Sequence, residues 1–256
     1  MKKTKKIESK KNIFSVYGLN GTRNILNAKT IEILFIDLMI DSKADKSNEI
    51  LNKIQKIKSK IRRYSKQHFL KKYKSKRTQG IVIYFRGNFI KNLPNYLNFS
   101  NKFCLLALDN LEDPQNLGQV IRTSECAGID GIIIPANKAV QLTESVLQVS
   151  QGAFLHVPIF ICKNLKYEIT KFKRKGLFII GFENSIKAQS WYEINFCKPT
   201  LIVIGSEGFG IRKEILNICN IKATIPMSGK INSLNVSSAT SAILFERQRQ
   251  LSKINL

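Results

Sequence analysis

Short apolar runs alternate with amphipathic stretches between residue 101 and residue 256. The apolar runs predict strands at 103–110, 131–135, 157–161, 177–182, 201–205 and 222–226. Stretches with apolar residues every three or four positions predict helices near 116–127, 141–151, 164–175 and 211–219, and a last helix from about 235. Strands that alternate with helices in this way indicate an α/β domain whose mostly parallel sheet is covered on both faces.

The preceding part of the chain has a pattern of its own. It predicts a strand at 31–40, an amphipathic helix at 47–60 with a lysine-rich outer face, and a strand at 80–85. The segment 61–79 between the last two mixes lysine and arginine with Tyr64, Phe69 and Tyr73. Such a mixture either contacts RNA phosphates and bases or forms a solvated basic face whose aromatic rings turn inward, and the sequence leaves both open.

Four segments follow from these patterns. We expect a disordered basic arm at 1–12, a small N-terminal αβ domain at 13–86, a linker rich in asparagine at 87–100, and the α/β domain at 101–256. The arm is too dense in lysine to pack against other residues.

The positive charge is concentrated in the N-terminal part. The net charge is +24; residues 1–100 hold 24 Lys and Arg against 6 Asp and Glu, and residues 101–256 hold 18 against 12. Nucleic acid is the natural partner of such a field, because neutralising phosphates releases counterions. An anionic membrane surface is the alternative, and part of the lysine excess is also what AT-rich coding sequence produces.

The numbers of cysteines and histidines and the lack of long apolar runs argue against a disulfide-rich, a metal-binding and a membrane-spanning protein. The five cysteines form no C-x-x-C pair, which argues against a disulfide framework and a zinc site. The only histidines are His68 and His156, so we expect no metal site, and His156 lies in an apolar run that favours a core position. The N-terminus has no apolar signal region and no run approaches a membrane span, so we expect a soluble cytoplasmic protein.

Three short segments concentrate glycine, asparagine and serine. They are NLGQVIR at 116–122, IGSEGFG at 204–210 and IPMSGKINSLNVSSA at 225–239. In this order and spacing they resemble the three motifs of the SpoU/TrmH family, the 2′-O-ribose RNA methyltransferases of the SPOUT class that use S-adenosylmethionine. The resemblance implies a C-terminal α/β trefoil-knot domain, an RNA substrate and a homodimer.

The resemblance also assigns residues to the cofactor. It implies that Gly205, Ile225 and Leu234 line S-adenosylmethionine, with Met227 as a further apolar wall. The glycine-rich segment follows a predicted strand at the carboxyl edge of the sheet, where open α/β folds bind ligands. It is neither a dinucleotide fingerprint nor a P-loop, and alone it would be as consistent with a structural turn.

The catalytic residues implied by the resemblance are Asn116, Arg122, Glu207, Ser233 and Asn235. A guanidinium keeps its proton in proteins, which argues against Arg122 as a general base, so we expect it to bind phosphate or stabilise the developing alkoxide. A surface ion pair with Glu125 is the structural alternative for Arg122. Asn116 as a helix cap and Glu207 as a surface carboxylate are the corresponding alternatives.

The N-terminal domain resembles the small ribosomal-protein-like substrate-binding domain of many family members. The similar segments are YGLNGTRNIL and TQGIVI, and Thr78 stands where the family pattern has histidine. This domain order is similar to that of bacterial enzymes that methylate a guanosine of 23S rRNA. A tRNA guanosine 2′-O-methyltransferase and a non-catalytic ribosome-assembly factor are the alternatives.

Overall fold

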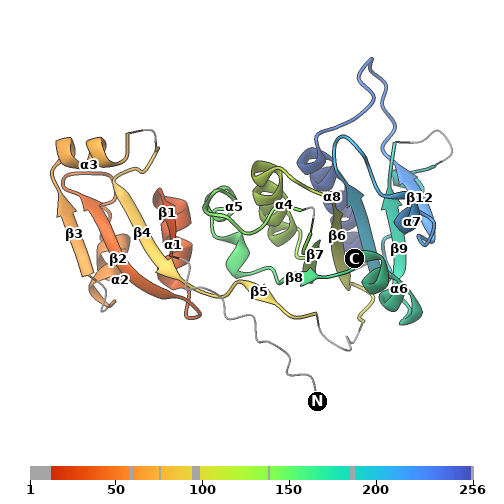
Figure 1. The fold of residues 1–256 in the computed structure, drawn as a ribbon, viewed down its shortest axis with the longest axis horizontal. Helices are drawn as coiled ribbons and strands as arrows, with labels where there is room; N and C mark the ends of the chain where they lie inside the picture. The colour runs from red at the N-terminus through yellow and green to blue at the C-terminus, as the bar shows by residue number, and fades with distance from the viewer. Residues whose placement is uncertain are drawn as a thin grey trace. The chain divides into compact units, whose positions relative to one another are not determined.

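The chain divides into two compact units, residues 1–88 and residues 89–256, in a computed structural model (Figure 1). The structure describes residues 13–57, 60–74, 76–93, 99–137, 139–184 and 188–254, with only the backbone of the last residue. The predicted basic arm at 1–12 and residues 94–98 of the predicted linker lie outside the described residues.

The described residues of the first unit form a four-stranded mixed sheet and three helices. Its elements are β1 (Phe14–Tyr17), α1 (Leu19–Asn27), β2 (Glu32–Met39), α2 (Asn48–Gln55), β3 (Lys60–Tyr64), α3 (Lys66–Lys72) and β4 (Ile81–Arg86). The strand order is β1-β4-β2-β3, with β4 antiparallel to β1 and β2, and β2 parallel to β3. The strand expected at 31–40, the helix expected at 47–60 and the strand expected at 80–85 are therefore present as β2, α2 and β4.

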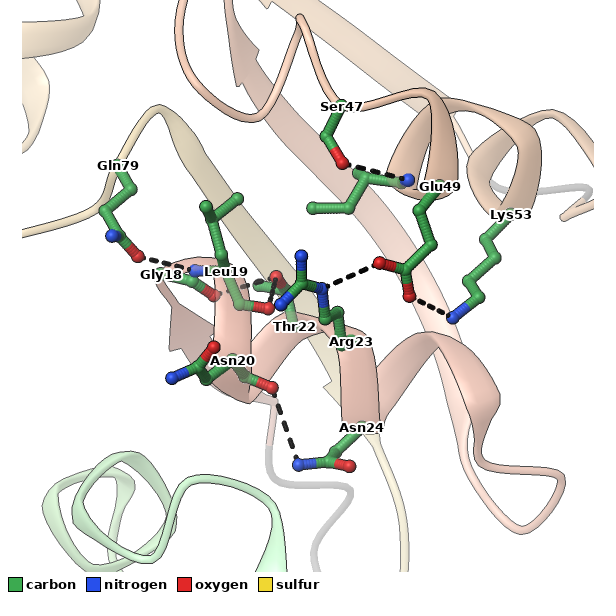
Figure 2. Close-up of polar contacts among 11 residues, drawn as sticks. Gly18, Leu19, Asn20, Thr22, Arg23, Asn24, Ser47, Glu49, Lys53 and Gln79 are labelled. Carbon is green, nitrogen blue, oxygen red and sulfur yellow. Dashed lines mark hydrogen bonds and ion pairs between the residues drawn. The ribbon is translucent and has the colours of Figure 1, made fainter.

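The start of α1 is held by the turn that precedes β4. The side-chain oxygen of Gln79 accepts a hydrogen bond of 2.8 Å from the backbone N–H of Leu19, the first residue of α1 (Figure 2). Gln79 and Gly80 both have positive φ, and a Cβ at Gly80 would lie 2.1 Å from that of Ser42. This position therefore requires glycine, since no side chain fits against Ser42.

The buried carboxylate of Asp37 in β2 joins this sheet to α3 through hydrogen bonds. Asp37 has no exposed surface and accepts hydrogen bonds from Arg62 (2.5 Å), Lys72 (2.7 Å) and Tyr73 (2.5 Å). Burial alone would raise the pKa of Asp37, but these donors outweigh it and lower the pKa below its usual range. Phe69 and Tyr73 are buried, so these two aromatic rings of the basic segment turn inward.

The second unit is built on an eight-stranded sheet in which every paired strand is parallel. Its strands are β5 (Ile90–Lys91), β6 (Cys104–Asp109), β7 (Gly131–Pro135), β8 (Ile159–Cys162), β9 (Phe178–Phe182), β10 (Gln189–Ser190), β11 (Thr200–Gly205) and β12 (Ile221–Thr224). Its helices are α4 (Pro114–Cys126), α5 (Glu144–Val149), α6 (Leu165–Arg174), α7 (Lys213–Leu216) and α8 (Val236–Ile254), with 3₁₀ turns η1 (Ala153–Leu155) and η2 (Trp191–Glu193). The order is β10-β12-β9-β11-β6-β7-β8-β5.

Helices cover both faces of this sheet. Alternate strand residues such as Leu105 and Val203 join one buried cluster with Ile169 and Phe172 of α6 and Ile215 of α7. Helix α4 packs against α5 and α8, and α8 contacts β11. Because neighbouring side chains of a strand point to opposite faces, the fully buried Leu106 and Ile202 point away from the first cluster. The fold is the mixed α/β architecture that the sequence predicts.

Two expectations differ from the structure. Residues 90–91, inside the predicted linker, form β5 and pair with β8, and therefore belong to the second unit. The prediction that His156 is a core residue is wrong, because its side chain is exposed after η1. Cys126 is also exposed, and all five cysteines are free.

Neither a metal cluster nor a membrane span occurs in the described part of the chain. No group of three or more His, Cys, Asp or Glu residues there could hold a metal ion. None of the described helices has the length and apolar character needed to cross a bilayer.

Candidate active site

A cavity of about 440 Å³ lies at the carboxyl ends of three adjacent strands, β9, β11 and β12. Its walls come from residues 182–184, 204–211, 224–225 and 227, from 232–234, and from Val236, Ala239 and Ile243 of α8. This volume is within the range of about 300–1,000 Å³ that is usual for small-molecule sites. The four residues expected to line a cofactor, Gly205, Ile225, Met227 and Leu234, all line this one cavity.

The loop after β11 folds back so that its two ends pack against each other. Ser206 and Gly210 form an antiparallel bridge, in which the Gly210 N–H donates to the Ser206 carbonyl at 3.0 Å. A Cβ on Gly205 would lie 2.0 Å from the backbone carbon of Gly210, a distance that no side chain can tolerate. Glycine is therefore required at 205 by the backbone of the loop itself.

The loop between β12 and α8 forms the opposite wall and extends beyond the edge of the sheet (Figure 1, blue). It is anchored to the end of β9, because the side-chain amide of Asn184 donates to the carbonyl of Asn232. Ser233 lines the cavity and is exposed.

Asn116, Glu207 and Asn235 meet in one hydrogen-bond network, although they come from three separate segments. Glu207 Oε1 accepts from Asn116 Nδ2 at 3.0 Å and from Asn235 Nδ2 at 2.6 Å. Asn235 Nδ2 also donates to Asn116 Oδ1 at 2.9 Å, and the Val236 backbone N–H lies 3.5 Å from Glu207 Oε1. The network joins the start of α4, the glycine-rich loop and the start of α8.

Asn116 is not the helix cap that spacing alone allowed. The cap of α4 is Asp113, whose carboxylate accepts from the backbone N–H groups of Gln115 and Asn116. Because Asp113 supplies the cap and Pro114 the first helical residue, the side chain of Asn116 is available for the network. At the other helix, Asn235 Oδ1 accepts from the Ser237 N–H at 2.9 Å and so caps α8.

A second anchor of the glycine-rich loop was missed from the sequence. Asp109, the last residue of β6, has no exposed surface and accepts from the Arg212 backbone N–H at 2.9 Å and from its Nε at 2.9 Å. Arg212 precedes the first residue of α7, directly after the loop, and the hydrogen bond to Asp109 raises the pKa of its guanidinium. The signal in the sequence was a carboxylate at the end of an otherwise apolar strand.

Arg122 lies apart from the cavity within this single chain. It is exposed on α4, six residues after Asn116, which on a helix is about 9 Å along the axis and about 120° away around it. No hydrogen bond or ion pair between described residues involves its side chain, so the expected alternative pairing with Glu125 is not formed.

A parallel sheet with a loop cavity at the carboxyl ends of its strands defines an α/β protein with a ligand site at the expected edge. Residues 104–245 match the model of the SpoU rRNA Methylase family, which is more than half of the chain. The chain therefore belongs to this family.

Individual relatives agree with this assignment. A protein of Staphylococcus saprophyticus assigned to the TrmH family of tRNA/rRNA methyltransferases is 41% identical over 142 residues. That match covers 56% of this chain, and the chain spans only 57% of the relative's length.

Solved structures are similar as well. The AdoMet-bound rRNA methyltransferase of Sinorhizobium meliloti has a TM-score of 0.73 at 22% identity, over 93% of this chain and 88% of that one, which shows the fold. The TrmH/SpoU tRNA modifying enzyme of A. aeolicus has a TM-score of 0.56 at 31% identity, over 60% of this chain and 78% of that one.

Proposed function

We propose that this protein transfers a methyl group from S-adenosylmethionine to a ribose 2′-hydroxyl of RNA. The observation that carries the proposal is that Asn116, Glu207 and Asn235 join the three motif segments by hydrogen bonds, and that the second and third of these segments line one cavity. A protein that only bound RNA would have no need to tie these segments together around a small-molecule site. Membership of the SpoU family gives independent support.

The cavity fits such a cofactor on its own features. Ile225, Met227 and Leu234 would give the adenine ring and the methylene groups of the cofactor an apolar wall. The hydroxyl of Ser206 is buried without a hydrogen-bond partner among the described residues, and a polar group of the cofactor would satisfy it. Bound S-adenosylmethionine supplies an electrophilic methyl group on a sulfonium centre.

The residues of the chain divide into two roles. Asn116, Glu207 and Asn235 are positioning residues, since they hold the two loops that form the cavity. Arg122 binds the phosphate next to the target ribose or stabilises the alkoxide that forms when the 2′-hydroxyl loses its proton. Ser233 lines the cavity and is free to contact either ligand.

The exposed position of Arg122 supports a homodimer in which it acts on the partner's cavity. Helices α4 and α8 pack together, with Thr123 and Ser241 hydrogen-bonded at 3.1 Å, and Phe245 of α8 is 51% exposed. An exposed apolar ring beside Arg122's helix is suited to an interface. We include the trefoil knot of the family in this proposal.

Mixing two inactive variants tests the arrangement. Arg122→Ala removes the guanidinium, and Gly205→Val blocks the cavity loop, so neither protein alone should transfer methyl groups. If Arg122 acts across a dimer, exchange of subunits should restore roughly a quarter of the wild-type activity, because half of random dimers are mixed and each has one complete site. No recovery, with exchange shown by native mass spectrometry, would contradict action across the dimer.

The substrate we propose is a guanosine of 23S rRNA, with the N-terminal unit selecting the RNA. The charge difference between the two parts of the chain supports this role. A tRNA guanosine is the second candidate, supported by the 31% identity to a tRNA modifying enzyme. The third candidate, a non-catalytic assembly factor, is disfavoured by the complete network.

Transfer of labelled methyl from S-adenosylmethionine to total rRNA and, separately, to total tRNA decides among these. We expect label in large-subunit rRNA, at a linkage that resists alkaline cleavage. Arg122→Ala should abolish transfer with little change in cofactor affinity, while Arg174→Ala, another exposed arginine, should leave transfer unchanged. Label in tRNA alone would favour the second candidate, and absence of cofactor binding would favour the third.

The role of the N-terminal unit has a test of its own. Replacing the exposed Lys60, Lys66 and Lys71 with Gln should weaken rRNA binding and reduce the slope of log K against log salt by about 0.7 for each phosphate that is no longer neutralised. The matched control removes the same charge from the second unit at Lys163, Lys166 and Arg174. An equal loss of affinity in both triple variants would contradict selection by the N-terminal unit.

A further inference from the structure

An aromatic side chain stands almost free in solvent at the wall of the candidate active site. Phe209 is 89% exposed and lines the same cavity as Glu207 and Ser233. No ring stacking or cation–π contact between described residues includes Phe209. Single exposed apolar residues are common on protein surfaces, but a ring at the wall of a ligand cavity is placed to contact what the cavity binds.

The backbone around Phe209 leaves room for a large planar group. Gly208 and Gly210 flank it, and a Cβ at either position would meet no atom within 4 Å. Gly210 also has a positive φ of 62°, which favours glycine there. The ring is thus presented on a loop whose base is fixed, since Gly205 packs against Gly210 and Asp109 holds Arg212.

The opposite loop has exposed apolar residues as well. Ile231 is 77% exposed and Leu234 is 43% exposed, and both belong to the loop between β12 and α8. The two loops that form the cavity therefore both offer apolar surface to solvent. They belong to residues 101–256, which hold 18 Lys and Arg against 12 Asp and Glu and so carry a net positive charge that attracts polyanions.

We propose that Phe209 stacks on a nucleobase of single-stranded RNA at the entrance of the cavity, and so positions the ribose that is methylated. RNA-binding proteins commonly hold unstacked bases on aromatic side chains, and every base has a face that can stack. This inference rests on the proposed function only for the identity of the reacting ribose. Its physical content, an aromatic ring on a base, can be measured without any methyl transfer.

The first test compares how substitutions of Phe209 change the affinity for RNA and the affinity for S-adenosylmethionine. Stacking of one base is worth about 1–3 kcal/mol, which corresponds to about a 5- to 150-fold change at 1.4 kcal/mol per tenfold. Phe209→Ala should therefore raise the Kd for RNA by about tenfold or more and leave the Kd for S-adenosylmethionine within about twofold. Phe209→Trp should keep RNA affinity, and Tyr192→Ala should change neither value, because Tyr192 is 61% exposed but lies outside the cavity.

The second test observes the contact directly in the full chain. Trp191 is the only tryptophan, so Trp191→Phe combined with Phe209→Trp places a single fluorophore at the proposed platform. Oligoadenylate should quench its emission, and inorganic polyphosphate, which has the charge but no bases, should not. Binding of the oligonucleotide is followed separately by the anisotropy of a labelled copy.

Each other outcome overturns the inference in a distinguishable way. Oligoadenylate that binds without quenching, or polyphosphate that quenches equally, would overturn stacking and leave the proposed function intact. Quenching by S-adenosylmethionine alone would assign Phe209 to the cofactor, and emission that shifts with protein concentration would assign it to a subunit interface. Failure of the wild-type chain to bind oligoadenylate would remove the inference together with the RNA part of the proposed function.

Discussion

Replacing Asp109 with asparagine should loosen the cofactor loop without changing its sequence. The carboxylate is completely buried at the end of β6. It accepts from the Arg212 backbone N–H and Nε at 2.9 Å each, and Arg212 Nη2 lies 2.9 Å from Oδ1. The amide of an asparagine would keep the shape but remove the charge and offer one acceptor oxygen in place of two. Arg212, which follows the cavity loop, would then lose most of its attachment to the end of β6.

The size of the effect follows from the exposure of the two partners. Breaking a fully buried ion pair costs about 3–5 kcal/mol, because the remaining charge is left without a partner. The Arg212 side chain is 40% exposed, so water takes over part of its solvation. We therefore expect Asp109→Asn to lower the unfolding free energy by about 2 kcal/mol and to weaken S-adenosylmethionine binding about tenfold.

Urea unfolding and titration calorimetry with S-adenosylmethionine measure the two effects. Arg249→Gln is the control, because Arg249 is 52% exposed and Glu246 keeps its hydrogen bond from Gln250, so breaking this pair should cost less than about 1 kcal/mol. A double-mutant cycle with Arg212→Gln should show that most of the loss is shared by the pair. Asp109→Asn with unchanged cofactor affinity and a stability within about 0.5 kcal/mol of wild type would refute the anchoring role.

Three further substitutions test other parts of the structure. Gly205→Ala should abolish cofactor binding, measured by calorimetry, because its Cβ would lie 2.0 Å from the Gly210 backbone. The lowered pKa of Asp37 gives the wild type a contribution to stability that is fully present above the ordinary pKa of 3.8 and is lost as pH falls through the lowered pKa. Asp37→Asn removes this contribution, so the unfolding free energy measured in urea should fall less steeply from pH 7 to pH 3 in the variant. Gln79→Ala removes the acceptor of the Leu19 N–H and should cost about 1 kcal/mol in the same assay.

The fold of the second unit was predictable because its central strands are buried on both sides. A strand such as β11 needs a continuous apolar run, and its flanking helices need a one-sided pattern, so both leave a clear signal. The edge strands β5 and β10 leave no such signal in the sequence, because they have only two residues each. In the first unit β3 was missed because its sequence, KIRRY, is largely basic and its register is fixed by a distant partner, the buried Asp37.

The candidate site was predictable only where one segment carries its own signal. Glycines and asparagines pointed to the loops, because these residues favour turns whatever surrounds them. The pair of Asp109 and Arg212 joins positions 103 residues apart, and Asn116 and Asn235 are 119 apart. No local pattern contains such a pairing, since it exists only once the sheet order brings the ends of β6 and β11 together.

The hydrogen-bond network also limits which residues can touch the substrate. Asn235 uses both N–H groups of its amide, on Asn116 and Glu207, and its oxygen accepts from Ser237. It cannot bind a ribose without releasing the start of α8. The guanidinium of Arg122 has five N–H donors, and no hydrogen bond between described residues uses them. Asn235 therefore has no free amide hydrogen for a substrate, whereas the guanidinium of Arg122 is free for the phosphate contact that we propose.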